Sequence, residues 1–123
     1  MATSKAKFIA SWVLIGLVAV GFLLAGLGKL TGSAGPMFEG WGYPSWFATL
    51  IGVLELAGAI GLLIPKTTRW AVLGLTFLMF GAAFTHVTNG EASQLARPGL
   101  FLMVMWAGLW LRGNSNPLQS SAG

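Results

Sequence analysis

Residues 46–64 have the sequence WFATLIGVLELAGAIGLLI, an apolar run in which Glu55 is the single charged residue. A helix of this length rises about 28 Å, which is close to the roughly 30 Å thickness of the hydrocarbon core of a bilayer. The run therefore predicts a helix that crosses a membrane and carries one acidic side chain near its middle.

Three other apolar runs predict three further helices. They are FIASWVLIGLVAVGFLLAGLG at 8–28, WAVLGLTFLMFGAAFTHV at 70–87, and a shorter run at 96–111. A membrane span needs about 17–25 residues, so the last run reaches across only if Ala96 and Arg97 belong to it. The four runs predict an all-α fold: one integral membrane domain over residues 1–123, built as a four-helix bundle with up-down-up-down order.

The composition of the chain agrees with a membrane protein. Of its 123 residues, 55% are hydrophobic and 8% are charged, whereas a typical soluble domain has about 25% charged residues. Cysteine is absent, which excludes disulfides, thiolate metal sites and a cysteine nucleophile. The net charge of +4 rests on too few residues to form a basic stripe, so we expect no nucleic acid as a partner.

The basic residues predict the orientation of the chain. With the N-terminus in the cytoplasm, five basic residues lie on the inner side and two on the outer side. The inner ones are Lys5, Lys7, Lys66, Arg69 and Arg112, and the outer ones are Lys29 and Arg97. Because cytoplasmic loops are enriched in Lys and Arg, we expect both termini to be cytoplasmic, in a bacterial-type inner membrane.

The segments between the apolar runs differ in character. Residues 29–45 form a long predicted loop whose Trp41 and Tyr43 suit the membrane interface. Residues 65–69 are a tight turn that makes the flanking helices antiparallel neighbours. Residues 113–123 are small and polar, which is typical of a frayed tail.

Glu55 is the residue that most needs an explanation. It lies nine residues from either end of its run, about 13–14 Å from each interface. An acidic side chain at that depth costs about 2.5–3.5 kcal/mol, so a partner, a proton or a ligand has to stabilise it. The candidate partners in the outer half are Lys29, His86 and Arg97. Two interpretations stay open: a structural ion pair, or a site for a polar ligand or a proton.

The remaining side chains give no complete catalytic or metal site. A single histidine without cysteine or a second histidine does not make a metal site, and no phosphate-binding loop or nucleophile motif is present. We therefore expect no catalytic residues and no activity from this chain alone. Met79, Phe84 and Trp106 are candidates to line a hydrophobic pocket, although such residues are more often core or lipid-facing.

Two segments carry a family resemblance. FLLAGLGKL at 22–30 and GVLELAG at 52–58, followed by a tight turn to a third helix, resemble the DoxX-like family of small four-helix membrane proteins. Phe38, Gly42 and Pro44 resemble the loop pattern of that family, and Lys29 and Glu55 match its Lys and Glu positions. The resemblance covers residues 8–111.

The resemblance implies several functions. Some members of the family are subunits of thiosulfate:quinone oxidoreductase or of terminal oxidases, so the first hypothesis is an accessory subunit of a larger membrane redox or energy-converting complex. The partners would then be other membrane subunits and the lipid bilayer. The alternatives are a protein that binds a quinone or another lipophile near Glu55, without a covalent cofactor, and a small transporter.

Overall fold

The computed structural model describes residues 2–113, and these residues form helices and no strand. The elements are α1 (Ala2–Leu30), α2 (Gly35–Gly40), α3 (Trp46–Leu63), α4 (Thr68–Thr88), a 3-10 helix η1 (Ala92–Leu95) and α5 (Ala96–Gly113). The prediction of an all-α fold is therefore confirmed. The predicted polar tail lies outside the described residues, apart from its first residue.

Three of the described helices are long and apolar enough to cross a membrane: α1 from Ser4 onward, α3 and α4. The fourth predicted span is also a helix, α5, but it does not belong to this group. Its 18 residues include Arg97 near one end and Arg112 near the other. These charges shorten the uninterrupted apolar stretch of α5.

The predicted helix bounds need three corrections. α1 begins at Ala2 instead of residue 8, because the alanines and lysines among residues 2–7 favour helix and continue it beyond the apolar run. Its 29 residues rise about 43 Å, more than a bilayer core requires. The predicted loop at 29–45 contains the short helix α2, which Pro36 opens at a position where a proline gives up no helical hydrogen bond. The link before α5 contains η1.

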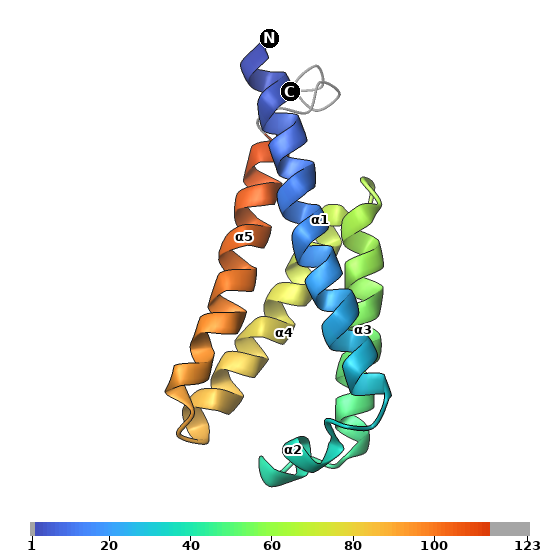
Figure 1. The fold of residues 1–123 in the computed structure, drawn as a ribbon, viewed down its shortest axis with the longest axis vertical. Helices are drawn as coiled ribbons and strands as arrows, with labels where there is room; N and C mark the ends of the chain where they lie inside the picture. The colour runs from blue at the N-terminus through green and yellow to red at the C-terminus, as the bar shows by residue number, and fades with distance from the viewer. Residues whose placement is uncertain (1, 114–123) are drawn as a thin grey trace.

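The four long helices form a ring in which α1 packs on α3 and α5, and α4 packs on the same two helices. Figure 1 shows that α1 begins and α5 ends at one end of the molecule, while α2 lies at the opposite end. Near that opposite end α3 and α4 diverge, and α2 lies beside the end of α3.

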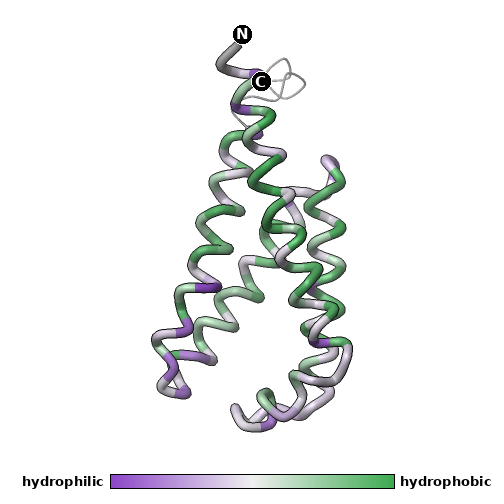
Figure 2. Tube along the Cα trace, in the orientation of Figure 1, coloured by the Kyte–Doolittle hydropathy of each residue, from purple (hydrophilic) through white to green (hydrophobic). Residues whose placement is uncertain are grey.

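The core fills the half of the molecule away from α2. It contains the buried side chains of Ile15, Val18, Ala19, Phe22, Ala59, Leu62, Val72, Leu75, Met79 and Met105. Many large apolar side chains point outward instead, such as Phe77, which is 77% exposed, and Trp70, which is 71% exposed. Figure 2 shows the apolar colouring along the long helices and the hydrophilic colouring near their ends. An outer surface of this kind suits lipid as the surrounding solvent.

α1 and α3 come closest where two glycines face each other. A Cβ atom added to Gly26 would lie 2.8 Å from the carbonyl oxygen of Gly52, and one added to Gly52 would lie 2.9 Å from the carbonyl oxygen of Gly26. Small residues let helix backbones approach in this way, which is a main source of helix association in lipid. The contact brings the Cβ of Lys29 against Gly52, one turn before Glu55.

Arg112 joins three helices at the other end of the bundle. It is 5% exposed, its Nη1 donates a hydrogen bond to Thr68 Oγ1 at 2.9 Å, and its guanidinium carbon lies 4.1 Å from the ring centroid of Trp12. The contact with an aromatic face stabilises the cation. Arg112 therefore links the end of α5 to the starts of α4 and α1.

Candidate functional site: a cavity between the helices

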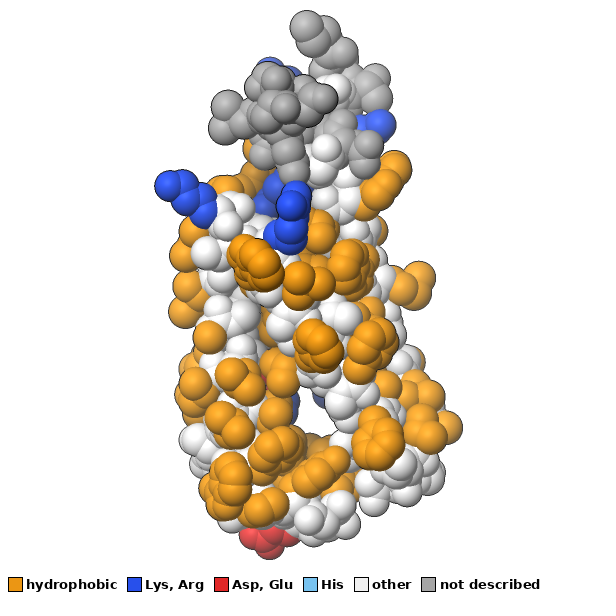
Figure 3. Space-filling model, turned by 180° about the vertical axis from the view of Figure 1, so that it is seen from behind, with side chains coloured by type: hydrophobic (Ala, Val, Ile, Leu, Met, Phe, Trp, Pro, Cys, Tyr) orange, Lys and Arg blue, Asp and Glu red, His pale blue; other side chains and the backbone are white. Residues whose placement is uncertain are grey.

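A cavity of about 690 Å³ opens where α3 and α4 diverge. Side chains from α1, α2, α3, α4 and α5 line it, together with Trp41 and Tyr43 from the loop after α2. Its volume lies within the roughly 300–1,000 Å³ that is usual for ligand sites. Figure 3 shows an opening in the surface near this end of the molecule, bordered by hydrophobic side chains.

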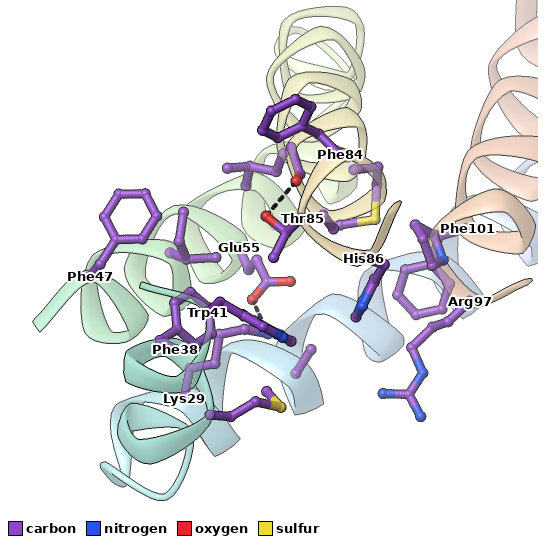
Figure 4. A pocket seen from close by; sticks show the side chains of 18 of the residues that line it. Lys29, Phe38, Trp41, Phe47, Glu55, Phe84, Thr85, His86, Arg97 and Phe101 are labelled. Carbon is purple, nitrogen blue, oxygen red and sulfur yellow. Dashed lines mark hydrogen bonds and ion pairs between the residues drawn. The ribbon is translucent and has the colours of Figure 1, made fainter. Parts of the chain in front are cut away.

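Apolar and aromatic side chains make up most of the wall. They come from five helices and are Leu24, Met37, Phe38, Phe47, Ile51, Phe77, Leu78, Met79, Phe84 and Phe101. The polar side chains that line the cavity are fewer, and Figure 4 shows Lys29, Glu55, Thr85, His86 and Arg97 among the aromatic ones. A mostly apolar wall with a few converging polar groups is typical of sites for small molecules.

Lys29 and Glu55 form an ion pair at the wall between α1 and α3. The Nζ of Lys29 lies 2.8 Å from Oε1 of Glu55, and the two side chains are 21% and 4% exposed (Figure 4). Lys29 ends α1, so its side chain reaches back along the helix to meet the middle of α3. Among residues 2–113, no hydrogen bond from another group reaches Oε1 of Glu55, so the ammonium is what compensates this buried oxygen.

His86, the second candidate partner of Glu55, binds a different carboxylate. Its Nδ1 lies 2.9 Å from Oε1 of Glu91, and the indole Nε1 of Trp41 donates to both oxygens of Glu91 at 3.2 and 3.3 Å. The rings of Trp41 and His86 meet edge to face, with 5.4 Å between their centroids. The hydrogen bond from His86, followed by that from Trp41, lowers the pKa of Glu91 below its ordinary value. This Trp41–His86–Glu91 cluster ties the loop after α2 to the end of α4.

A second tie joins the same two regions. The hydroxyl groups of Tyr43 and Thr85 are 2.8 Å apart, and Thr85 Oγ1 donates to the carbonyl of Gly81 at 2.9 Å. Because the proton of Thr85 is used there, Tyr43 is the donor to Thr85. Gly42, with φ of +95°, makes the turn that separates Trp41 from Tyr43.

Arg97 approaches the cavity from the start of α5, next to Pro98 and Phe101, which also line it. The ring of Phe101 lies over Gly21 of α1, where an added Cβ would come within 2.8 Å of it, so α5 stands close to α1 at this point. Arg97 is exposed, and within residues 2–113 the structure gives it neither an ion pair nor a hydrogen bond. Figure 4 shows the guanidinium of Arg97 on the far side of His86 from Lys29.

The structure thus brings Glu55, Lys29, His86 and Arg97 together around one cavity, with Met79 and Phe84 in its wall. Trp106 does not line it: its indole Nε1 donates to Thr76 Oγ1 at 3.0 Å elsewhere between α4 and α5. Trp106 is turned away because that hydroxyl satisfies its polar atom.

The sequence analysis did not predict that Trp41, Tyr43, Thr85 and Glu91 lie at or beside the cavity. The two aromatic residues of the predicted loop were the signal that could have indicated it. Among residues 2–113, no group of three or more His, Asp or Glu side chains is placed to hold a metal ion.

Comparison with known proteins agrees with this architecture. A model of the DoxX-like family matches residues 13–108, a range that includes α3 and α4 entirely and most of α1 and α5. The chain belongs to the DoxX-like family. The resemblance seen in the sequence is therefore confirmed, and with the three apolar helices it identifies a small membrane protein.

Among curated proteins, this DoxX-like chain is 36% identical over 57 residues to a Bacillus subtilis (strain 168) protein described as uncharacterized protein YdgD. The matched region is 43% of this chain and 50% of that protein, so the match spans about half the length of the relative. No solved structure matches the chain.

Proposed function

We propose that this DoxX-like protein binds one lipophilic small molecule, a quinone or a lipid, in the cavity between its helices. The observation that carries the proposal is the cavity itself: about 690 Å³ of space with a mostly apolar wall that also contains the side chains of Lys29, Glu55, His86 and Arg97. A molecule with an apolar body and a polar end fits such a wall. The ion pair of Lys29 and Glu55 then serves as part of a polar ligand site as well as a contact between helices.

The proposal includes a topology. All four long helices cross a bacterial inner membrane in up-down-up-down order, and both termini lie in the cytoplasm. The five basic residues at the end of the molecule away from α2 support this orientation. The cavity then lies in the outer half of the membrane, where a lipophile enters from the side.

A binding experiment with a glycine pair tests the proposal. Gly81 and Gly74 both lie in α4, and an added Cβ meets no atom within 4 Å at either position. Gly81 lines the cavity and Gly74 does not. With decylubiquinone and hexadecanol as probes and the protein in nanodiscs, we expect Gly81→Leu to weaken binding about tenfold, or about 1.4 kcal/mol. Gly74→Leu is the matched control and should bind like the wild type.

Two results would contradict the proposal. One is that the wild-type protein binds no lipophilic probe, whether neutral or anionic. The other is an equal effect of the two leucine substitutions, because it would place the bound molecule outside the cavity.

A second candidate function is that of an accessory subunit in a larger membrane complex. Gly16 in α1 and Gly74 in α4 favour it. No atom lies within 4 Å of a Cβ added to either glycine, so a helix of another subunit could pack closely there. Purification in mild detergent tests it: a defined set of co-purifying membrane proteins supports it. Recovery of this chain alone from native membranes counts against it.

A further inference from the structure

The charges around the cavity are not balanced. Four ionisable side chains other than tyrosine line it: Lys29, Glu55, His86 and Arg97. Glu55 is the one carboxylate among them, and Lys29 already compensates it. His86 is engaged by Glu91, which does not itself line the cavity. Arg97 is the cation that is left over.

The hydrogen-bonding groups around the cavity are also unbalanced, because donors without a partner outnumber acceptors without one. The indole N–H of Trp41 donates to Glu91. The hydroxyl of Tyr43 donates to Thr85, and the hydroxyl of Thr85 donates to the carbonyl of Gly81. The donors that remain belong mainly to cations: the five N–H groups of Arg97 and two of the three N–H groups of Lys29. A ligand that satisfies this site has to supply acceptors and negative charge.

We infer that the ligand is an amphiphile whose headgroup is an anion, a carboxylate or a phosphate, and that Arg97 binds this headgroup. The inference rests on the proposed function, since it concerns the same cavity. A guanidinium holds either anion through two parallel hydrogen bonds, which are stronger than hydrogen bonds between neutral groups. Arg97 is exposed at the start of α5, so the headgroup would lie toward the membrane surface. The chain of the ligand then lies against Phe101, Phe77 and Leu24.

Four probes separate the inference from the proposed function. They are palmitate, monohexadecyl phosphate, hexadecanol and decylubiquinone, each titrated into the full-length protein in nanodiscs of zwitterionic phosphatidylcholine at alkaline pH. The bound fraction is measured by native mass spectrometry. The anionic probes should bind at least about tenfold more tightly than hexadecanol, which has the same chain and no charge.

Substitutions then assign the effect to Arg97. Arg97→Gln should weaken the anionic probes about tenfold and leave hexadecanol unchanged, and unchanged hexadecanol binding also shows that the variant is folded. Arg97→Lys should recover part of the loss. Arg69→Gln is the matched control, because Arg69 is an exposed arginine that does not line the cavity.

The outcomes are distinct. Preference for palmitate alone, or for hexadecyl phosphate alone, supports the inference and names the headgroup. Equal binding of palmitate, hexadecyl phosphate and hexadecanol, or an equal loss of all three in Arg97→Gln, overturns the inference while the proposed function stands. Binding of none of the four probes overturns the proposed function itself.

Discussion

Glu55 shows how one buried residue organises its surroundings. Its carboxylate lies near the middle of α3 with 4% of the side chain exposed, where an uncompensated charge is strongly unfavourable. Lys29 supplies the opposite charge at 2.8 Å, yet it sits at the end of α1 with a long flexible stem. The two partners are therefore not equivalent: a lysine at a helix end can turn outward to water, and a carboxylate at mid-helix cannot.

That asymmetry predicts different results from two substitutions. Lys29→Met leaves a buried carboxylate without its cation, which should cost about 3 kcal/mol of unfolding free energy at neutral pH. Glu55→Gln leaves a lysine that reaches water, so its cost should be smaller. Unfolding of both variants in mixed micelles measures the difference.

Equal costs for the two substitutions would contradict this account. Lys66→Met is a control for the loss of a lysine, since Lys66 is exposed in the turn between α3 and α4. It should change the unfolding free energy by less than about 1 kcal/mol.

The sequence predicted part of this site for physical reasons. Glu55 was identified because a charged residue in the middle of an apolar run needs a partner. Lys29 was a candidate partner because a lysine side chain is long enough to reach it. The pairing of His86 with Glu91 and Trp41 was not predictable, because the hydrogen bond from Trp41 to Glu91 joins residues 50 positions apart. It depends on the path of two loops, which apolar periodicity does not specify.

At the scale of elements, the close approach of α1 and α3 at Gly26 and Gly52 positions Lys29 beside Glu55. Gly52→Ala would place a Cβ 2.9 Å from the backbone oxygen of Gly26 and 2.9 Å from the Cβ of Lys29. Since a backbone oxygen cannot move without its helix, we expect a loss of about 1–3 kcal/mol of unfolding free energy. Gly16→Ala in α1 meets no atom within 4 Å and is the matched control. Equal stability of the two variants would rule out a tight helix contact at Gly52.

The Trp41–His86–Glu91 cluster predicts a pH dependence at the end of α4. The pKa of Glu91 is lower in the folded protein than its ordinary value of 4.5, chiefly through the hydrogen bond from His86. The stabilisation is therefore present above pH 4.5 and disappears as the pH falls through the lowered pKa. Glu91→Gln should remove this acid-sensitive part. Hydrogen exchange of the 41–43 loop, measured from neutral pH down to below 4.5, reports it.

Glu39→Gln is the comparison for that experiment, because Glu39 is exposed on α2 and its carboxylate has no hydrogen-bond or ion-pair partner among the described residues. It should leave the pH profile of the loop unchanged. If hydrogen exchange of the 41–43 loop depends on pH in the same way in the wild type and in Glu91→Gln, the cluster does not stabilise the loop.

At the scale of the whole molecule, the proposed topology is open to a labelling experiment. The chain contains no cysteine, so Thr67→Cys and Ser93→Cys each give a single thiol, at exposed positions near opposite ends of α4. In intact cells, an impermeant thiol reagent should label Cys at position 93 and not at position 67. Labelling in the opposite pattern would invert the topology and move the mouth of the cavity to the cytoplasmic side.

The sequence predicted the helices of this fold better than their assembly. Long apolar runs located α1, α3, α4 and α5, because a helix that meets lipid has to be apolar over most of its length. It did not predict α2, which has six residues and contains a proline and two glycines, so its local signal is that of a loop. The cavity was also beyond prediction, since it arises from the divergence of α3 and α4.

The charged side chains of the cavity lie on one side of the molecule, and this gives the protein a sidedness toward its surroundings. In the proposed orientation, the half in the inner leaflet has a groove between α3 and α4 without charged side chains, and the half in the outer leaflet has the cavity. A lipophile that diffuses in the inner leaflet meets no charged side chain in that groove, whereas one in the outer leaflet reaches Lys29, Glu55, His86 and Arg97. The fraction of cavities that hold a ligand would then depend on the composition of the outer leaflet alone. Transfer of the ligand from one leaflet to the other would change that fraction.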